Sequence, residues 1–171
     1  MPRFRVGILT CSDLSARGQR EDTSGAAIRE LIAGIDAAVA RYEVVPDEQA
    51  VIAERLRAWA DADRLDIILT TGGTGFGPRD VTPEATMEVV ERLAPGLAEA
   101  MRAEGLKTTP MSMISRAVAG VRGSTLIVNL PGSPSAVRES LSVILPVLPH
   151  ALELLRGEPT EHGPSEKKRA S

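Results

Sequence analysis

Residues 65–80, LDIILTTGGTGFGPRD, join a short apolar segment to a glycine-rich turn that closes with an arginine and an aspartate. The apolar part is rich in β-branched residues and lacks polar alternation, which is typical of a strand buried on both faces of a parallel sheet. Glycine permits positive φ and close approach of backbone N–H groups to a ligand. The following VTPEA predicts a helix with Thr82 at its N-cap and Pro83 at its first position. A strand, a glycine turn and a helix in this order predict a phosphate or carboxylate site.

Two common nucleotide-binding loops do not fit this turn. Gly72 and Gly77 have P-loop spacing, but Pro78-Arg79 stands where lysine and serine or threonine are required, and Pro78 replaces the last glycine of the dinucleotide pattern. A ligand-free turn, in which the charge of Asp80 stabilises the helix start, is the alternative. Polar residues after other predicted strands favour a ligand site at one sheet edge. They are Ser12-Asp13, Pro46-Asp47 and residues 129–134.

Strands and helices alternate along the first half of the chain. The predicted strands are 4–10, 41–47 and 65–71, and the predicted helices are 23–41 and 48–61. The second half predicts helices at 83–93 and 96–106, a hairpin turning at Arg122-Gly123, and a helical segment at 135–156 divided by Pro146 and Pro149. We therefore expect an α/β fold whose sheet is mostly parallel, mixed because of the hairpin, and covered by helices on both faces.

Length and composition limit the number of domains, the classes of partner and the cell compartment that we expect. The 171 residues suit one domain, which we place at 1–156, and 157–171 have no apolar anchor and predict a disordered tail. A net charge of -3 provides no global attraction for nucleic acid or anionic membranes, so we expect neither as a partner. One cysteine, no signal peptide and no long apolar segment indicate a reducing cytoplasm. Cys11 is predicted to be a small buried residue at a strand end. Met101, Met111 and Met113 are predicted to be packing residues, near an interface if a trimer forms, and two histidines are too few for a zinc centre.

Four motifs in order resemble the MogA/MoaB family of molybdenum-cofactor biosynthesis, whose domain also occurs in gephyrin. They are SDLSARG (12–18), VPDEQ (45–49), LTTGGTGFGPRDVTPEAT (69–86) and SRAVAGVRGSTLIVNLPGSPSAVRE (115–139). The resemblance covers about residues 5–157 and implies a three-layer α/β/α fold, a homotrimer or hexamer, and binding of molybdopterin. Mog-type members transfer AMP from ATP with Mg²⁺ to molybdopterin, releasing pyrophosphate, and a molybdenum-insertion enzyme is then an expected partner.

The resemblance places the family's two functional aspartates at Asp47 and Asp80. Carboxylates with Mg²⁺ suit adenylyl transfer, because negative charge develops on the α-phosphate and the leaving pyrophosphate. We assign Asp80 to the metal and Asp47 to metal binding or nucleotide positioning. The alternative for Asp47 is the N-cap of the helix that follows it. The attacking phosphate is already ionised near neutral pH, so positioning and charge neutralisation matter more than a strong base.

The other motif residues are predicted to bind substrate. They are Ser12, Asp13, Gly72, Gly73, Thr74, Gly75, Asn129, Pro131, Gly132 and Ser133. Arg79 is a candidate phosphate clamp because guanidinium binds two oxygens at once, and its alternative is a solvated surface arginine. Ser115 and Arg116 belong to a family motif, but their spacing assigns them no role.

Three functions remain open from the sequence. The leading hypothesis is a Mg²⁺-dependent molybdopterin adenylyltransferase, which the pair Asp47 and Asp80 favours. The second is a noncatalytic molybdopterin-binding protein of the MoaB type, or a scaffold. The third is an unrelated α/β enzyme acting on phosphorylated metabolites, against which the four ordered motifs argue.

Overall fold

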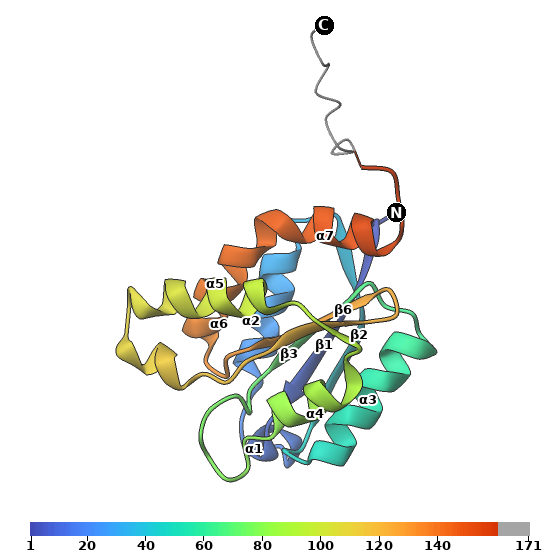
Figure 1. Cartoon of the computed structure of the whole chain (residues 1–171). Coiled ribbons are helices and arrows are strands. Elements are labelled where there is room, and N and C mark those ends of the chain that lie inside the picture. Colours follow the sequence, from blue (N-terminus) through green and yellow to red (C-terminus); the bar gives the residue numbers. More distant parts are fainter. Residues whose placement is uncertain (161–171) are drawn as a thin grey trace, which may run out of the picture.

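Six strands form one sheet in residues 1–160, the part of the chain that the computed structural model describes (Figure 1). They are β1 (Phe4–Cys11), β2 (Ala37–Val45), β3 (Ile67–Thr71), β4 (Arg92–Leu93), β5 (Ala119–Arg122) and β6 (Thr125–Leu130). Their order is β2-β1-β3-β6-β5-β4; the first four are parallel, and β5 is antiparallel to both of its neighbours. The predicted mixed, mostly parallel sheet is confirmed.

Helices cover both faces of the sheet, so the three-layer α/β/α fold is also confirmed (Figure 1). One layer contains α2 (Thr23–Ile32), α5 (Pro95–Leu106), α6 (Pro134–Ile144) and α7 (Leu148–Leu155). The other contains α3 (Gln49–Asp61) and α4 (Thr82–Val89). Shorter elements are α1 (Asp13–Ala16), η1 (Pro110–Ile114) and η2 (Leu145–Val147).

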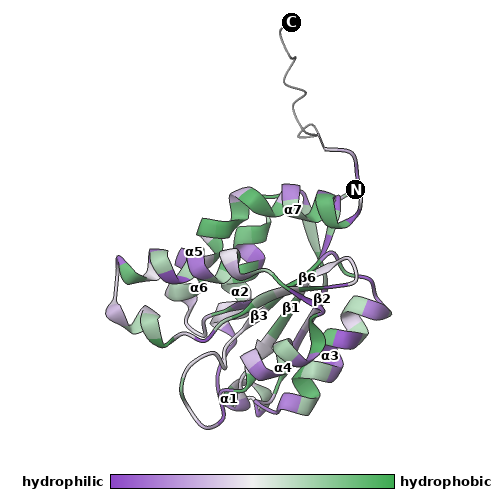
Figure 2. Cartoon of the chain, in the orientation of Figure 1, coloured by the Kyte–Doolittle hydropathy of each residue, from purple (hydrophilic) through white to green (hydrophobic). Residues whose placement is uncertain are grey.

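Side chains of β1 pack against both helical layers. Phe4, Val6 and Ile8 belong to the core under α2 and α6, whereas Leu9 and Cys11 belong to the core under α3. Successive strand residues point to opposite faces, so a strand covered on both sides is apolar throughout. In contrast, α3 has one buried face, and Figure 2 shows both hydrophilic and hydrophobic residues along it.

The predicted helix over 23–41 is wrong in its second half. The helix ends at Ile32, and Ala37–Val45 pairs with β1 as strand β2. The Asp36 carbonyl accepts hydrogen bonds from the N–H groups of Arg3 and Phe4 at 3.1 and 3.0 Å, which begins this pairing. Alanine-rich residues favour a helix locally, but pairing with β1 overrides that preference.

Two smaller predictions also need correction. Helix 83–93 ends at Val89, and Arg92–Leu93 forms β4 against β5. The hairpin turns at 123–124, one residue later than predicted, because Arg122 pairs with Thr125. Met101 is buried as expected. Met111 and Met113 are 64% and 66% exposed in the single chain, so their packing at an interface between copies stays a prediction. Division of the last helical segment by its prolines is confirmed.

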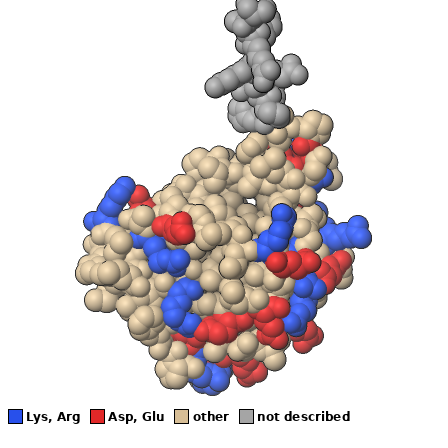
Figure 3. Space-filling view, in the orientation of Figure 1, with Lys and Arg blue, Asp and Glu red and all other residues tan. Residues whose placement is uncertain are grey.

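Most of the predicted disordered tail, 161–171, lies outside the described residues. Its first part is described, and there Glu158 pairs with Arg3 and Arg156. Within 1–160, no helix is long and apolar enough to cross a membrane. On the face shown in Figure 3, acidic and basic side chains are interspersed.

Candidate functional site

A cavity of about 550 Å³, which we call the polar cavity, lies where β1, β3 and β6 end. The predicted site residues that line it are Ser12, Asp47, Gly72, Gly73, Asp80, Gly132 and Ser133. The structure therefore brings together residues from four separate motifs, because parallel strands present their carboxyl ends at one edge of the sheet.

The turn after β3 requires glycine at two successive positions. Gly72 and Gly73 have φ of 93° and 69°, in the left-handed region that other residues rarely adopt. A Cβ on Gly72 would lie 2.4 Å from the Cys11 carbonyl oxygen, and one on Gly73 would lie 2.3 Å from Thr82 Oγ1. The prediction that Thr82 is an N-cap is wrong: Val81 precedes the helix without a side-chain capping bond, and the Thr82 hydroxyl is buried beneath the turn.

Asp47 is held by a reciprocal pair of hydrogen bonds with Asp13. The Asp13 N–H donates to Asp47 Oδ2 at 2.9 Å, and the Asp47 N–H donates to Asp13 Oδ1 at 3.0 Å. Asp47 Oδ1 is buried and has no hydrogen-bond partner among the described residues. Burial raises the pKa of the Asp47 carboxyl, and the charges of Asp13 and Asp80 raise it further. The alternative that Asp47 caps α3 is wrong, because Glu48 occupies the N-cap and α3 has no side-chain capping bond.

Asp80 lies at the end of the loop that follows the glycine turn. Its Oδ2 accepts a hydrogen bond from the Gly77 N–H at 2.9 Å. A Cβ on Gly75 or Gly77 would lie 3.0 or 2.9 Å from that same oxygen, so the loop folds closely around the carboxylate. The second carboxylate of the polar cavity is thus held by the loop itself.

Asp47 and Asp80 are the carboxylates of the polar cavity that could hold a Mg²⁺ ion. A buried carboxylate oxygen without a partner is unfavourable unless a cation or proton reaches it. No group of three or more acidic, histidine or cysteine side chains suited to a metal occurs within residues 1–160. Mg²⁺ usually binds through one or two carboxylates together with substrate phosphates, and it retains several waters. Asp47 and Asp80 would be its protein ligands.

Arg116 connects the loop of residues 74–80 to the second half of the chain. Its backbone N–H donates to the Thr74 carbonyl, its Nε to the Gly75 carbonyl and its Nη2 to the Asp80 carbonyl, each at 2.8 Å. Its Nη1 pairs with Glu84 on α4. Sequence reasoning missed this role, although Arg116 lies in a quoted motif. Thr74 and Gly75 stay predicted binders, but their carbonyls are already taken by Arg116.

Arg79 and Asp13 form a two-pronged ion pair rather than lining the polar cavity. Arg79 Nε and Nη2 donate to the two Asp13 oxygens at 3.0 and 2.9 Å. These hydrogen bonds lower the pKa of Asp13 and raise that of Arg79. Arg79 is therefore held, through Asp13, next to Asp47. Its side chain is 58% exposed, so it lies at the surface as the alternative hypothesis has it, and its role as a phosphate clamp stays a prediction.

Sequence reasoning also missed Arg20 and Asp22, which line the polar cavity. Asp22 caps α2 by accepting a hydrogen bond from the Gly25 N–H at 2.9 Å, and it accepts others from Thr10 and Tyr42. Burial, followed by the bond to Asp22, raises the pKa of Tyr42 to about 12. An aspartate three residues before a helical glycine was the available signal for this cap. Arg20 brings a cation to a cavity that otherwise carries three carboxylates, Asp22, Asp47 and Asp80.

Asn129 and Pro131 line a different cavity. Asn129 is fully buried, and its amide donates to the hydroxyls of Thr70 and Thr86 at 3.0 and 2.9 Å. Its oxygen accepts from the Val118 N–H at 3.2 Å. This amide therefore joins β3, α4 and β6 inside the protein. Cys11 is buried as predicted, and burial raises its pKa to about 12, so it remains a thiol at neutral pH.

Comparisons with known proteins agree on one family. Residues 7–150 match the family model described as "Probable molybdopterin binding domain". The chain is 40% identical over 159 residues to molybdopterin adenylyltransferase of Helicobacter pylori, covering 92% of this chain and 90% of that protein. It is 44% identical over 156 residues to molybdenum cofactor synthesis protein cinnamon of Drosophila melanogaster, where it spans 91% of this chain but only 26% of the relative. The crystal structure of the molybdopterin biosynthesis enzyme MoaB from Thermus thermophilus matches with a TM-score of 0.87 and 62% identity, covering 91% and 98% of the two chains.

Proposed function

The chain belongs to the molybdopterin-binding domain family, and from this premise we propose that it is a molybdopterin adenylyltransferase that transfers AMP from Mg²⁺-ATP to the terminal phosphate of molybdopterin. The observation that carries the proposal is the pair of carboxylates in the polar cavity, with Asp47 Oδ1 buried and without a partner beside the glycine turn. The 40% identity to a named molybdopterin adenylyltransferase supports it.

In this proposal, the polar cavity aligns two phosphate groups. A terminal oxygen of molybdopterin phosphate forms a bond to the α-phosphorus of ATP, and the bond from that phosphorus to the bridging oxygen breaks. The electron pair leaves with pyrophosphate. The second pKa of a phosphate monoester is about 6, so the attacking oxygen needs no protein base at neutral pH. The proposed role of the residues is therefore to position the phosphates and neutralise their charge.

Three groups of residues would share that work. The N–H groups of Gly73, Thr74 and Gly75 donate no hydrogen bond to any described residue, so they are free to donate to phosphate oxygens. Arg20 would neutralise part of the phosphate charge. Asp47 and Asp80 would hold Mg²⁺, which when bound stabilises the charge that develops on the leaving pyrophosphate.

The test is adenylyl transfer by the purified protein. Molybdopterin, ATP and Mg²⁺ are mixed, and pyrophosphate and adenylylated molybdopterin are followed for wild type and for Asp80→Asn. We expect product from wild type and a loss of at least about 100-fold in the variant, the scale for removing a charged group that acts in the transition state. A retained circular dichroism spectrum is the control for folding. Undiminished turnover in Asp80→Asn would refute the role of this carboxylate.

A noncatalytic molybdopterin-binding protein is the second candidate. The solved structure with 62% identity is named a molybdopterin biosynthesis enzyme, MoaB, and that name does not specify adenylyl transfer. This candidate predicts that molybdopterin binds while ATP is not consumed, so the same assay separates the two functions.

We further propose a homotrimer, or a hexamer, that passes its product to a molybdenum-insertion enzyme. The support for self-association is the exposure of Met113 and Ile114 at 66% and 43%, since a second copy would cover such apolar side chains. Sedimentation equilibrium should give a mass that is a multiple of 18.1 kDa by three or six. A monomer at micromolar concentration would contradict this part of the proposal.

A further inference from the structure

The hydroxyl of Thr82, beneath the glycine turn, is a buried polar group that the proposed function leaves unused. Thr82 is fully buried, and its Oγ1 makes no hydrogen bond with another described residue. Burying a hydroxyl without a partner costs free energy, because the hydrogen bonds that it made with water are not replaced. An unpaired hydroxyl in such a place therefore points to a ligand or an ordered water beside it.

The backbone of Thr82 is fixed from both sides. Its N–H donates to the Gly73 carbonyl at 3.2 Å, and its carbonyl accepts a hydrogen bond from Thr86 Oγ1 at 2.9 Å. The amide of Asn129 donates in turn to Thr86 Oγ1, also at 2.9 Å. Because threonine is β-branched and has few χ1 rotamers, a fixed backbone leaves its hydroxyl few directions in which to find a partner.

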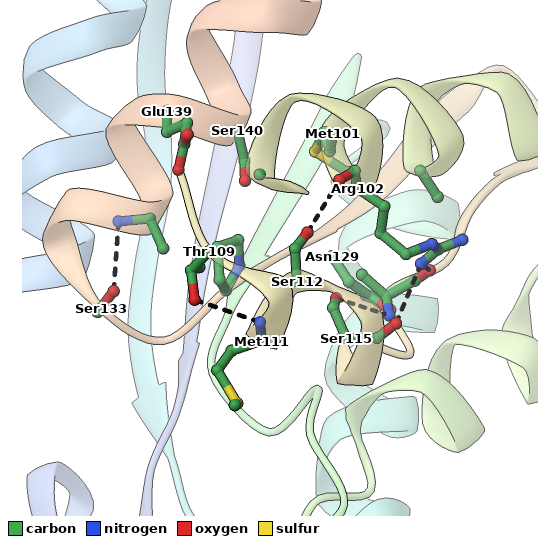
Figure 4. A pocket seen from close by; sticks show the side chains of 15 residues that line it. Met101, Arg102, Thr109, Met111, Ser112, Ser115, Asn129, Ser133, Glu139 and Ser140 are labelled. Atoms are coloured by element: carbon green, nitrogen blue, oxygen red, sulfur yellow. Dashed lines mark hydrogen bonds between the residues drawn. The ribbon is translucent and has the colours of Figure 1, made fainter. Parts of the chain in front are cut away.

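Asn129 connects these hydrogen bonds to a second cavity, of about 280 Å³, between α5, η1, α6 and the end of β6 (Figure 4). We call it the apolar pocket, because apolar surface makes up most of its wall. Ser133 lines both this pocket and the polar cavity, so the two cavities meet at the turn that follows β6. Thr82 is thus anchored from the side of the apolar pocket, whereas its hydroxyl lies against Gly73, which lines the polar cavity.

The carboxylate of Asp47 also has an unpaired oxygen beside Gly73. A Cβ on Gly73 would lie 2.3 Å from Thr82 Oγ1 and 3.2 Å from Asp47 Oδ1, so both oxygens adjoin the same glycine. Both are buried, and neither makes a hydrogen bond with a described residue. Two neighbouring oxygens that do not bond directly can share one water, whose hydrogen bonds each span about 2.8 Å.

The thiol of Cys11 also lies beside the Thr82 hydroxyl, but it is a poor partner. Burial raises the pKa of Cys11 to about 12, so its sulfur is a neutral thiol, which accepts hydrogen bonds only weakly. Its Sγ donates instead to the Leu9 carbonyl at 3.9 Å. A carboxylate oxygen is a stronger acceptor than a thiol, so Asp47 is the better partner for a water that also contacts Thr82.

We propose that Thr82 is a positioning residue of the divalent-cation site, and that its hydroxyl and Asp47 Oδ1 hold between them one water of the cation's coordination shell. This inference rests on the proposed function, because it takes Asp47 and Asp80 as the ligands of Mg²⁺. Mg²⁺ keeps several waters when it binds to protein carboxylates. A hydroxyl can accept a hydrogen bond from such a water, and it then orients the metal's ligands without being one of them.

Binding of Mn²⁺ without ATP or molybdopterin tests the inference. Mn²⁺ favours the same octahedral oxygen ligands as Mg²⁺, and electron paramagnetic resonance distinguishes the free ion from the bound one. Thr82→Val keeps the shape of the side chain and removes its hydroxyl. We expect it to weaken Mn²⁺ binding at least about tenfold, the usual effect of losing a group that orients metal ligands. Its Tm without the cation should equal or exceed that of wild type, because the lost hydroxyl has no protein partner.

Three further variants separate the hydroxyl from packing and locate the ion. Thr82→Ser keeps the hydroxyl but loses a buried methyl group, so its Tm should fall while its Mn²⁺ affinity stays within about threefold of wild type. Thr125→Val is the matched control, because Thr125 is also buried but its Oγ1 donates to the Leu65 carbonyl at 2.6 Å, at the start of β6 and away from the polar cavity. It should lose about 2–4 °C in Tm with unchanged Mn²⁺ affinity. Asp80→Asn, which removes a proposed ligand, should weaken Mn²⁺ binding and so place the ion in the polar cavity.

Other results would overturn the inference. Unchanged Mn²⁺ affinity in Thr82→Val would show that the hydroxyl takes no part in cation binding. Equal weakening in Thr82→Val and Thr82→Ser would assign the effect to packing. Absence of Mn²⁺ binding by wild type, or binding that Asp80→Asn leaves unchanged, would remove the cation from the polar cavity. If Mn²⁺ binding depends on Thr82 as expected yet no adenylylated molybdopterin forms, the proposed enzyme activity fails while this inference stands.

Discussion

Replacing Arg116 by methionine removes the guanidinium that braces the loop carrying Asp80. The change breaks hydrogen bonds to the Gly75 and Asp80 carbonyls, both at 2.8 Å, and the pair with Glu84. Bonds from a charged donor contribute up to about 3 kcal/mol, but water can replace these in a half-exposed loop, so we assign about 1 kcal/mol to each. The Glu84 side chain of the ion pair is 43% exposed, so this pair adds at most about 1 kcal/mol.

The expected loss is therefore about 2–3 kcal/mol, or about 4–12 °C in Tm for a domain of this size. Urea unfolding and thermal melts measure it. In the adenylyl-transfer assay, the Mg²⁺ concentration for half-maximal rate should rise about 10- to 100-fold, the usual cost of losing a residue that orients a metal ligand. This second effect follows from the proposed role of Asp80.

Arg122→Met is the matched control. Arg122 makes two hydrogen bonds to Asp61, at 3.0 and 2.9 Å, and one to the Val89 carbonyl at 2.9 Å, away from the polar cavity. It should lose comparable stability with an unchanged Mg²⁺ requirement. The reasoning fails if Arg116→Met keeps the wild-type Mg²⁺ requirement, or if both variants raise it equally.

Two further predictions concern Gly73 and Asp47, which line the polar cavity. Gly73→Ala should lower the free energy of unfolding by more than about 3 kcal/mol, because positive φ costs about 1–2 kcal/mol and its Cβ would also meet Thr82 Oγ1 at 2.3 Å. Gly123→Ala is the control: Gly123 has φ of 57°, but a Cβ added there would meet no atom within 4 Å, so only the backbone cost of about 1–2 kcal/mol applies. Equal losses in the free energy of unfolding of the two variants, measured in urea, would contradict this account. The raised pKa of Asp47 means that the native state keeps its proton above pH 3.8, where the unfolded chain loses it, so this carboxyl lowers stability as pH rises. Without Mg²⁺, Asp47→Asn should therefore gain stability relative to wild type between pH 4 and pH 7, and a constant difference would count against burial as the cause.

The strands were predictable where burial on both faces left a continuous apolar segment. β1 and β3 are such segments, and their ends lie within two residues of the prediction. Residues 37–40 were predicted as helix because AAVA has no signal of its own for a strand. Its structure depends on β1, which lies more than 30 positions earlier in the chain.

In the candidate site too, some residues were identified from the sequence and others only from the structure. Asp47 and Asp80 were found because the resemblance to the MogA/MoaB family places its two functional aspartates at these positions, although their assigned roles remain predictions. Arg116 was left without a role, because its carbonyl partners Gly75 and Asp80 are 41 and 36 positions away. The apolar pocket was missed for the same reason, since it is built from α5, η1, α6 and β6.

The sequence by itself determined the alternation of strands and helices, the mixed sheet and the polar ends of its strands, because hydrophobic periodicity and turn residues act over a few neighbouring positions. Only the tertiary structure decided that Asp13 pairs with both Asp47 and Arg79, that Asp47 keeps a buried oxygen without a partner, and that a second cavity adjoins the first. These features arise when distant segments pack, and hydrogen bonding and burial at such contacts depend on geometry that no local pattern encodes.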